Sequence, residues 1–412
     1  MKMRSKGTMV FIRYCFFSFI SVLFFTNGLS ATPAYTRANI IIRTINSIDR
    51  LPIFHLKNKP DTVVNNKPDL YYECKLADIG KNSPIDFDYN SYVKRYIDIF
   101  TIERRAQVAK MIGLSEYYFP LFEEILSKYQ LPLELKYLAV VESALNPLAV
   151  STSGAVGLWQ FKINTAKMFD LKVTNFVDER MDPIKSTEAA AQYLQYLFRT
   201  FNDWHLALAA YNVGPGAVRN AIERANGERS FWKLYPQLPE SAQNYVPAFI
   251  AIAYVFQNYQ DHGLIPSSLV PSLSSVDTIE VKKPLDLRLT SEELGIDIEL
   301  IRFLNPTYRY DYVPESDSPQ IILLPKDKIG LFIRKSKQLY LNTSKPKGKM
   351  PVGSKNGSYQ TAYTVRNGDT LHKLAIHFGC TLDDIYRWNP GIDSVINVGQ
   401  TLIFWVDDSV SN

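Results

Sequence analysis

Hydrophobic residues recur at helical spacing along most of the stretch from residue 89 to residue 262. Three segments show the pattern most clearly: YVKRYIDIF, YYFPLFEEILSKY and EAAAQYLQYLFRTF. In each, apolar side chains return every three or four positions, as they do on one face of a helix. Pro132, the pair Asn146-Pro147 and the turn Gly214-Pro215-Gly216 interrupt the pattern. The sequence therefore predicts a domain built mainly from helices over residues 89–262.

Two segments nearer the C-terminus repeat one another. Residues 279–306 align with residues 363–390 without a gap, and both contain a strand pattern, two helical patterns separated by Gly, and an Asn-Pro stop. A β-rich run follows each copy. We therefore expect two small α+β modules with the order βααβ, over residues 276–327 and 361–406. Residues 341–360 are rich in Lys, Gly and Ser, which predicts a linker between the modules.

The first 31 residues have the pattern of a secretory signal peptide. A basic region precedes the apolar run YCFFSFISVLFF and a stretch of small residues. This run is short for a bilayer span of about 20 residues, although an uncleaved anchor remains the alternative. The sequence assigns no role to residues 32–88. Cleavage would leave Cys74 and Cys380, which either pair in an oxidising compartment or remain two separate thiols.

The composition argues against a nucleic-acid partner. The 412-residue chain has a formal net charge of +5. Four basic residues and no acid lie within residues 1–31, so the mature chain carries about +1 (5 − 4). No basic helix or mixed aromatic and basic motif supports nucleic-acid binding. The five His and the Cys spacing predict no metal site, and nothing indicates a cofactor.

Glu142 is the one ionisable residue in the segment VVESALNPLAVSTSGAVGLWQF (140–161). We expect it on a helix that Asn146-Pro147 ends, on one face with the apolar residues at i−4, i−3 and i+3. A carboxylate on such a ridge is desolvated, which raises its pKa and lets it donate a proton near neutral pH. A glutamate at the exposed end of a helix is the alternative.

The residues after Glu142 have features of a ligand-binding site. Three closely spaced small residues, Gly154, Ala155 and Gly157, let the backbone approach a ligand without intervening side chains. Trp159 offers a stacking face, and Gln160 offers an amide that can bond sugar hydroxyl or acetamido groups. Farther along, Tyr211 and Asn212 precede the Gly-Pro-Gly turn. Taken singly, each feature also has a structural explanation, such as a core tyrosine or a helix stop.

Taken together, these motifs carry a family resemblance. ESALNPLAVSTSGAVGLWQF, AYNVGPGAV and QNYVPAF resemble, in this order, the signature motifs of soluble-lytic-transglycosylase-type catalytic domains (glycoside hydrolase family 23). The segments between them resemble the D branch of the membrane-bound lytic transglycosylases. YTVRNGDTLHKLA, GCTLDDIYRWNP and VGQTLIF resemble a LysM peptidoglycan-binding module. The resemblance implies a multidomain protein with a mainly α, lysozyme-like catalytic domain, followed by small α+β LysM-type modules.

The resemblance also assigns roles by position. It makes Glu142 the catalytic acid, and it places five further residues along the glycan-binding groove: Ser151, Gln160, Tyr211, Asn212 and Tyr245. In the LysM module it assigns sugar contacts to two loops: Gly368, Asp369 and Thr370, and Pro390, Gly391 and Ile392.

Some positions depart from the family pattern. The first repeat has Pro284-Leu285-Asp286 where the second has Gly368-Asp369-Thr370, so we expect the first repeat to pack rather than to bind sugar. Trp159 replaces the Met of many relatives, a change that we expect the groove to tolerate. No Cys stands at a plausible lipoprotein cleavage point, unlike in the lipid-anchored branch.

The resemblance implies a peptidoglycan lytic transglycosylase that leaves 1,6-anhydromuramic acid ends, with Glu142 as acid and then base. One alternative is a lysozyme-type muramidase, which would need a second carboxylate; another is an inert wall-binding protein. Four acidic residues are expected as helix caps and ion-pair partners, unless one is that second carboxylate: Asp178, Glu179, Asp182 and Asp203.

The expected partner is the glycan strand of peptidoglycan, and the expected location is the periplasm or cell envelope after export. We expect no stable membrane insertion once the signal peptide is removed. The sequence does not indicate the oligomeric state.

Overall fold

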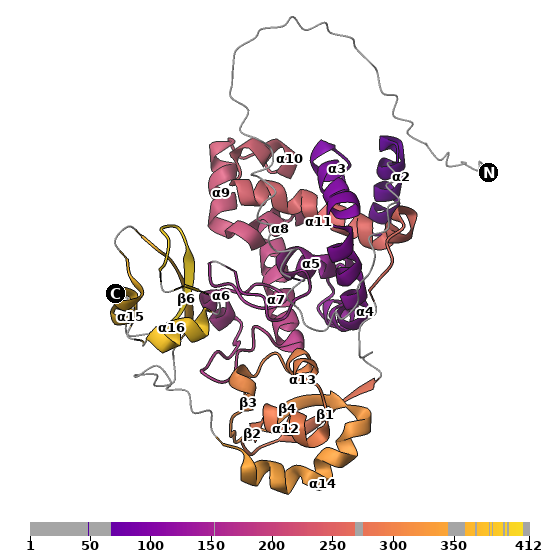
Figure 1. Cartoon of the computed structure of the whole chain (residues 1–412). Coiled ribbons are helices and arrows are strands. Elements are labelled where there is room, and N and C mark those ends of the chain that lie inside the picture. The colour runs from indigo at the N-terminus through magenta and orange to yellow at the C-terminus, as the bar shows by residue number, and fades with distance from the viewer. Residues whose placement is uncertain are drawn as a thin grey trace, which may run out of the picture. The chain divides into compact units, whose positions relative to one another are not determined.

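The computed structural model describes residues 67–151, 153–267, 275–344, 359–366, 369–378, 382–389, 392–393 and 395–406, together with residues 48 and 380. We divide them into a helical unit (67–267), a first module (275–344) and a second module (359–406), which Figure 1 colours in this order from indigo to yellow. The predicted signal peptide over residues 1–31 lies outside the described residues. Within them, no helix is both long enough and apolar enough to cross a bilayer.

The helical unit is built from helices of very different length. They are α2 (Asp69–Gly80), α3 (Ser91–Asp98), α4 (Arg105–Lys128), α5 (Tyr137–Ser143), α6 (Ile163–Met168), α7 (Pro183–Phe201), α8 (Trp204–Val213), α9 (Pro215–Arg224), α10 (Phe231–Leu234) and α11 (Glu240–Asn258). The π-helical turn η2 (Ile99–Glu103) and the 3-10 turns η3 (Leu133–Lys136), η4 (Tyr235–Gln237) and η5 (Tyr259–His262) connect some of them. The helical periodicity of the sequence predicted this class of fold correctly.

Helix α11 forms the core of the helical unit. Every residue from Tyr245 to Phe256 is buried, as expected of a helix that is surrounded by other elements. Helices α3, α5 and α8 pack against it, and Figure 1 shows it running between them. The short helix α5, which carries Glu142, therefore lies against an apolar neighbour.

The helical unit begins earlier in the chain than the predicted boundary at residue 89. Helix α2 buries Tyr72 and Leu76 in the main hydrophobic core. The Tyr72 ring also stacks on the His262 ring, with 6.2 Å between their centroids. Because these side chains complete the core, residues 67–88 belong to the unit and are not a separate segment.

The first module contains two small antiparallel sheets of two strands each, together with three helices. Its elements are β1 (Val276–Val281), β2 (Leu285–Asp286), α12 (Leu287–Leu294), α13 (Ile298–Leu304), the 3-10 turn η7 (Arg309–Asp311), β3 (Tyr312–Val313), β4 (Gln320–Pro325) and α14 (Lys326–Asn342). Strand β1 pairs with β4, and β2 pairs with β3. Helix α14 buries Phe332 and Leu339 in the module's core. The module therefore continues beyond the predicted end at residue 327, because this helix covers part of its core.

The second module repeats the βααβ order with β5 (Tyr359–Thr364), α15 (Leu371–His377), α16 (Leu382–Trp388) and β6 (Thr401–Val406). Strands β5 and β6 are antiparallel. The predicted linker over residues 341–360 is shorter than expected, since α14 ends at Asn342 and β5 begins at Tyr359. Its residues 345–358 lie outside the described part of the chain.

A shared hydrogen-bond pattern supports the internal repeat. In the first module, the Asn305 amide donates to Ile301 O and Leu323 O and accepts from Leu323 N. In the second module, Asn389 makes the same three types of bond, to Ile385 and Ile403. Each asparagine thus ties the end of a helix to the last strand, which explains why the sequence pattern contains Asn at both positions.

The first module also shares its packing with the helical unit. Val276, Phe303 and Leu304 belong to the main hydrophobic core, and the Phe303 ring lies 5.3 Å from the Tyr117 ring. At the end of the helical unit, shortly before the first module begins, Ser267 N donates to Ala109 O of α4 at 2.9 Å. These contacts agree with the expectation that the first repeat has a packing role.

Gly113 in α4 lies so close to the backbone of Ser267 that adding a methyl group there should destabilise the protein. A Cβ atom added at Gly113 in α4 would lie 2.0 Å from Ser267 O. We expect Gly113→Ala to destabilise the helical unit by about 1–3 kcal/mol, because the backbone has to move. Exposed Gly330 in α14 meets only the end of the Arg334 side chain, at 3.6 Å. Gly330→Ala should therefore be neutral or slightly stabilising. Melting temperatures measured by circular dichroism compare the two variants, and equal shifts would contradict the close packing.

Candidate functional site

Glu142 lies at the end of a helix that stops abruptly. Helix α5 ends at Ser143, three residues before the predicted stop at Asn146-Pro147. The reason is that Ala144 and Leu145 both adopt left-handed backbone conformations, with φ of 54° and 60°. Such a conformation costs a non-glycine residue about 1–3 kcal/mol and persists only where surrounding contacts enforce it. Because the helix ends there, Leu145 does not continue the helical face that carries Glu142.

Ser143 fastens this helix end to the segment that follows. Its hydroxyl bonds Ala139 O at 3.0 Å and Leu158 O at 2.9 Å. Residues 149–151 and 153–161, which we call the motif loop, fold back through isolated bridges between Val150 and Val156 and between Val156 and Phe161. The position of Glu142 and the course of the motif loop are therefore linked by direct bonds.

Two of the predicted sugar-contact residues shape the motif loop itself. Ser151 Oγ accepts from the backbone of Ala155 at 3.0 Å, and Gln160 Nε2 donates to Ala149 O at 3.2 Å and Gly157 O at 2.9 Å. Both side chains remain partly exposed. These bonds hold the loop in shape, in addition to any contact that the side chains make with a ligand.

Trp159 does not provide the stacking face that the sequence suggested. Its side chain is fully buried, its ring packs 5.2 Å from the Phe122 ring, and its Nε1 donates to Thr187 Oγ1 at 2.8 Å. Trp159 is a core residue, and its indole supports the loop from inside. Local sequence could not reveal this, because the partners Phe122 and Thr187 come from α4 and α7.

Among the residues that the structure describes, the Glu142 carboxyl group has one hydrogen-bond partner, the hydroxyl of Tyr245. This hydroxyl, on buried helix α11, donates to Glu142 Oε1. Burial raises the pKa of Glu142 from 4.5 to about 7, and the hydrogen bond from Tyr245 offsets part of the rise. No second carboxylate contributes to this shift among the residues that the structure describes. The side chain is half-buried, so it is desolvated but still accessible.

Tyr211 completes the surroundings of Glu142. Burial raises the pKa of its hydroxyl well above the ordinary value, and the charge of Glu142 raises it further. This hydroxyl donates to Trp159 O at 2.8 Å, which ties α8 to the motif loop. The next residue, Asn212, is exposed. The structure therefore brings Tyr211 and Tyr245 near Glu142 from two helices that are distant in sequence.

The four acidic residues that could have supplied a second carboxylate are caps and ion-pair partners. Asp182 caps α7 and Asp203 caps α8 through bonds to backbone N–H groups. Glu179 pairs with Lys185 at 2.6 Å. Asp178 is fully buried between Arg180 and Arg309. The expected structural roles of these residues are confirmed.

The residues assigned to sugar contact in the second module are only partly described. Asp369 Oδ2 accepts from Arg366 N at 2.7 Å and from the Tyr363 hydroxyl at 2.8 Å. Thr370 Oγ1 accepts from Lys373 N at 3.2 Å at the start of α15. Ile392 packs against the module's core. Gly368, Pro390 and Gly391 lie outside the described residues.

Two further sequence expectations can be compared with the structure. Cys74 and Cys380 are both free thiols, so the alternative of a bridge between them is not adopted. Among the residues that the structure describes, no group of three His, Cys, Asp or Glu side chains could hold a metal ion.

Comparison with known families agrees with the resemblance read from the motifs. The transglycosylase SLT domain matches residues 120–234, a segment that includes Glu142. The family described as "Lytic transglycosylase MltD, LysM-like domain" matches residues 275–341, and the LysM domain matches residues 363–405. The first of these module matches extends over α14, in agreement with the module boundary seen in the structure.

Known relatives carry related names. Membrane-bound lytic murein transglycosylase D of Escherichia coli K12 is 30% identical over 283 residues, which are 67% of this chain and 60% of that protein. The chain thus spans about 60% of this relative's length. Soluble lytic murein transglycosylase of the same strain is 34% identical over 116 residues, 27% of this chain and 18% of that protein. The crystal structure of the 70 kDa soluble lytic transglycosylase from E. coli has 18% identity and a TM-score of 0.33. It covers 57% of this chain and 45% of that one.

Because the pKa of Glu142 is raised in the folded state, the ionised form of this residue should destabilise the folded protein at high pH. The folded protein keeps this carboxyl protonated up to about pH 7, whereas the unfolded chain ionises it near 4.5. Stability is therefore lost as the pH rises through this window. We expect Glu142→Gln to raise the melting temperature relative to the wild type above about pH 7, with the difference shrinking toward pH 4.5. Exposed Glu116 in α4 provides the control Glu116→Gln. A pH-independent difference for Glu142→Gln would contradict the desolvation of Glu142.

The Tyr245 hydroxyl predicts a measurable shift of the Glu142 titration. Its hydrogen bond favours the ionised carboxylate, so Tyr245→Phe should raise the pKa of Glu142 above about 7. Carbon-13 NMR of labelled glutamate can follow the carboxyl carbon directly. Tyr254→Phe is the matched control, because that hydroxyl lies on the same helix but bonds His262. An unchanged midpoint in Tyr245→Phe would show that the hydrogen bond does not tune this acid.

Proposed function

We propose that this chain, a member of the SLT-domain transglycosylases with C-terminal LysM-type modules, is a peptidoglycan lytic transglycosylase. It cleaves the β-1,4 bond between N-acetylmuramic acid and N-acetylglucosamine and leaves 1,6-anhydromuramic acid ends. The observation that carries the proposal is a half-buried Glu142 with a pKa of about 7 inside the segment that matches the SLT domain. A group of this pKa can give and take a proton at neutral pH.

One carboxyl group is sufficient for this reaction. Protonated Glu142 donates its proton to the glycosidic oxygen as the bond to C1 of the muramyl residue breaks. The substrate's own 2-acetamido oxygen stabilises the positive charge at C1, so no enzyme nucleophile is required. Ionised Glu142 then takes the proton of the muramyl 6-hydroxyl, whose oxygen attacks C1 and closes the anhydro ring. The enzyme regains its proton in the second step, and no water is consumed.

Tyr245 suits this two-step use of one acid. Its hydroxyl bonds Glu142 Oε1, and such a bond stabilises the carboxylate that remains after the first proton transfer. Desolvation destabilises the ionised carboxylate, which makes it a stronger base for the second proton transfer. The balance of these two effects keeps the pKa of Glu142 close to neutrality.

Ser151, Gln160, Tyr211, Asn212 and Tyr245 are the residues that we assign to the glycan site. The position of Tyr211 and Tyr245 near Glu142, and that of Ser151 and Gln160 on the motif loop, support this assignment. The second module, with Asp369 and Thr370 at the start of α15 and Ile392 after α16, would hold the enzyme on the glycan. Export to the periplasm by residues 1–31 follows from the same proposal.

The muramidase alternative is less well supported. A hydrolase on this scaffold needs a second carboxylate to activate water. The four acids considered for that role are engaged as helix caps or ion-pair partners. The inert wall-binding alternative leaves the raised pKa of Glu142 without a use.

Digestion of purified peptidoglycan sacculi tests this proposal. The wild type should release muropeptides with anhydro ends, identified by mass spectrometry as one water lighter than reducing ends. Glu142→Gln should lower turnover by at least about 100-fold, the usual contribution of a positioned acid or base, while the variant still sediments with sacculi. Glu116→Gln serves as the control.

The products also separate the alternatives. Reducing ends from the wild type would identify a hydrolase. Release of no muropeptide by the folded wild type would favour the wall-binding protein. Undiminished turnover in Glu142→Gln would remove Glu142 from the catalytic role.

A further inference from the structure

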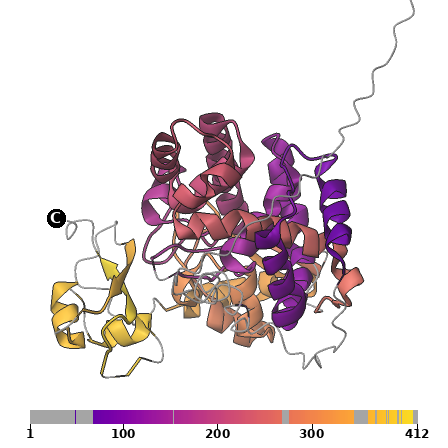
Figure 2. The ribbon, with the colours of Figure 1, turned by 90° about the horizontal axis from the view of Figure 1, so that it is seen from above.

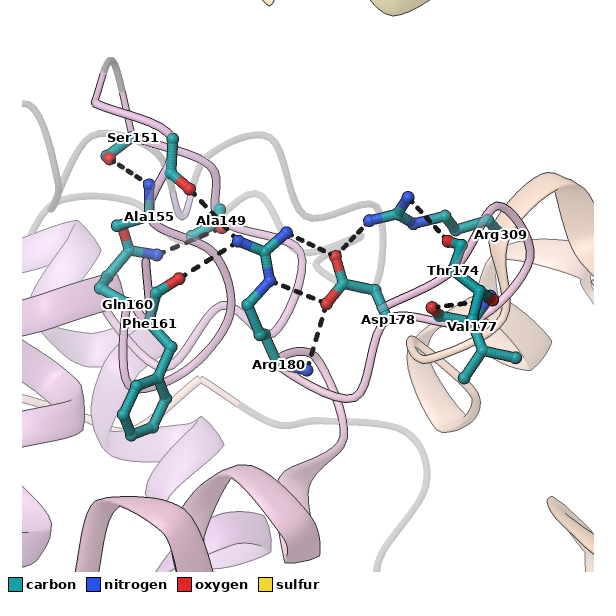
Figure 3. Close-up of polar contacts among 11 residues, drawn as sticks. Ala149, Ser151, Ala155, Gln160, Phe161, Thr174, Val177, Asp178, Arg180 and Arg309 are labelled. Atoms are coloured by element: carbon teal, nitrogen blue, oxygen red, sulfur yellow. Dashed lines mark hydrogen bonds and ion pairs between the residues drawn. The ribbon is translucent and has the colours of Figure 1, made fainter. Parts of the chain in front are cut away.

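A row of buried charges connects the first module to the motif loop. Asp178 and Arg180 are fully buried, and the Arg309 side chain is only 11% exposed. Figure 3 shows the Asp178 carboxylate between the two guanidinium groups, with Arg309 coming from the first module. Asp178 Oδ2 accepts from Arg309 Nη2 and, at 2.8 Å, from Arg180 Nη2. Asp178 Oδ1 accepts from Arg180 Nε at 2.9 Å.

Arg180 also forms hydrogen bonds to the motif loop. Its Nη1 donates to Gly154 O and Phe161 O, both at 3.3 Å. The backbone of the two segments is also in direct contact, since a Cβ atom added at Gly157 would lie 1.9 Å from Arg180 O. Gly157 has a φ of +87°, which glycine adopts readily and other residues do not. The motif loop is therefore shaped to lie on Arg180.

Arg309 is held in place by several bonds across the junction. Its backbone N donates to Phe176 O at 2.8 Å, and its Nη1 donates to Thr174 O at 3.2 Å. In the opposite direction, Asp178 N donates to Thr307 O at 2.9 Å. An isolated bridge joins Val177 to Tyr308. The chain segment 174–180 thus has the first module on one side and the motif loop on the other.

Arg309 lies in a loop whose position is equivalent in the two repeated modules. Residues 307–309 directly follow Asn305-Pro306, as residues 391–393 follow Asn389-Pro390 in the second module. In the second module this loop is expected to contact sugar. In the first module the corresponding loop contacts the helical unit instead. The loop at this position therefore has different roles in the two modules. In the first module it contacts the helical unit, and Arg309 forms an ion pair there with Asp178.

We propose that Arg309 is a positioning residue for the active site: through Asp178 and Arg180 it fixes the motif loop, so that the first module supports catalysis. The inference rests on the proposed function for its kinetic consequences. A buried carboxylate between two guanidinium groups has a defined geometry, because each fork-shaped partner accepts few orientations. Removing one partner frees Asp178, and with it Arg180, to reorient. Small displacements of positioned groups can lower turnover by about 100-fold.

The experiment compares three full-length variants. Arg309→Met removes the charge and its bonds, and Arg309→Lys keeps the charge but loses the two-pronged contact with Asp178 and Thr174. The matched control is Lys335→Met, which also removes one positive charge but breaks a pair with Glu293 inside the first module, at 2.6 Å. Turnover is measured on soluble glycan strands well below the melting temperature of each variant. Hydrogen exchange is followed at the amides of residues 149–161.

We expect Arg309→Met to lower kcat by about tenfold or more, with a much smaller change in KM. Exchange at residues 149–161 should become faster while that of helix α11 stays the same. Arg309→Lys should fall between this variant and the wild type, and Lys335→Met should match the wild type. If Arg309→Met does not fold, the proposal is tested by comparing kcat and the exchange of residues 149–161 in Arg309→Lys with those in Lys335→Met.

Unchanged kcat and unchanged exchange of the motif loop in the Arg309 variants would overturn the proposal, as would an equal loss in Lys335→Met. Failure of the proposed function has a different signature. The wild type would then release no anhydro products, while the exchange measurement would still show whether Arg309 holds the motif loop.

Discussion

The site depends on the burial of one carboxyl group against an apolar helix. Glu142 lies beside α11, whose residues from Tyr245 to Phe256 are all buried, and its carboxyl group has no ion-pair partner in the described part of the chain. A charge in such a place is poorly solvated, so the protonated form is favoured. A hydrogen bond from the Tyr245 hydroxyl partly stabilises the ionised form, so that the pKa stays near 7. The same surroundings that reduce stability at high pH make the group useful as an acid and a base.

The backbone around Glu142 needs support from distant elements. Two consecutive non-glycine residues, Ala144 and Leu145, have left-handed conformations immediately after the helix. Such strain persists at functional sites only where neighbouring contacts hold it. Ser143 bonds Leu158 O, and buried Trp159 bonds Thr187 of α7. The helix end and the motif loop therefore form one structure, which depends on α4, α7 and α8 for its position.

The two repeated modules show how one scaffold can serve different purposes. Asn305 and Asn389 make the same hydrogen bonds between helix and strand, so the framework is preserved. The loops that follow them differ in sequence. In the first module this loop reaches the helical unit through Thr307 and Arg309. Repetition in sequence thus indicates a common fold, whereas the use of each copy depends on the residues in its loops.

The sequence by itself determined the features that depend on local pattern. Hydrophobic periodicity predicted the helices, the repeat predicted both βααβ modules, and the motifs around Glu142 identified the candidate acid. Tertiary structure alone decided the partners of these residues. Tyr245 is 103 positions from Glu142, and Arg309 is 131 positions from Asp178. It also decided that Trp159 is buried and that residues 67–88 and α14 belong to their neighbouring cores. The physical reason is that periodicity arises within a few residues, whereas burial, pKa and charge pairing depend on which distant elements pack together.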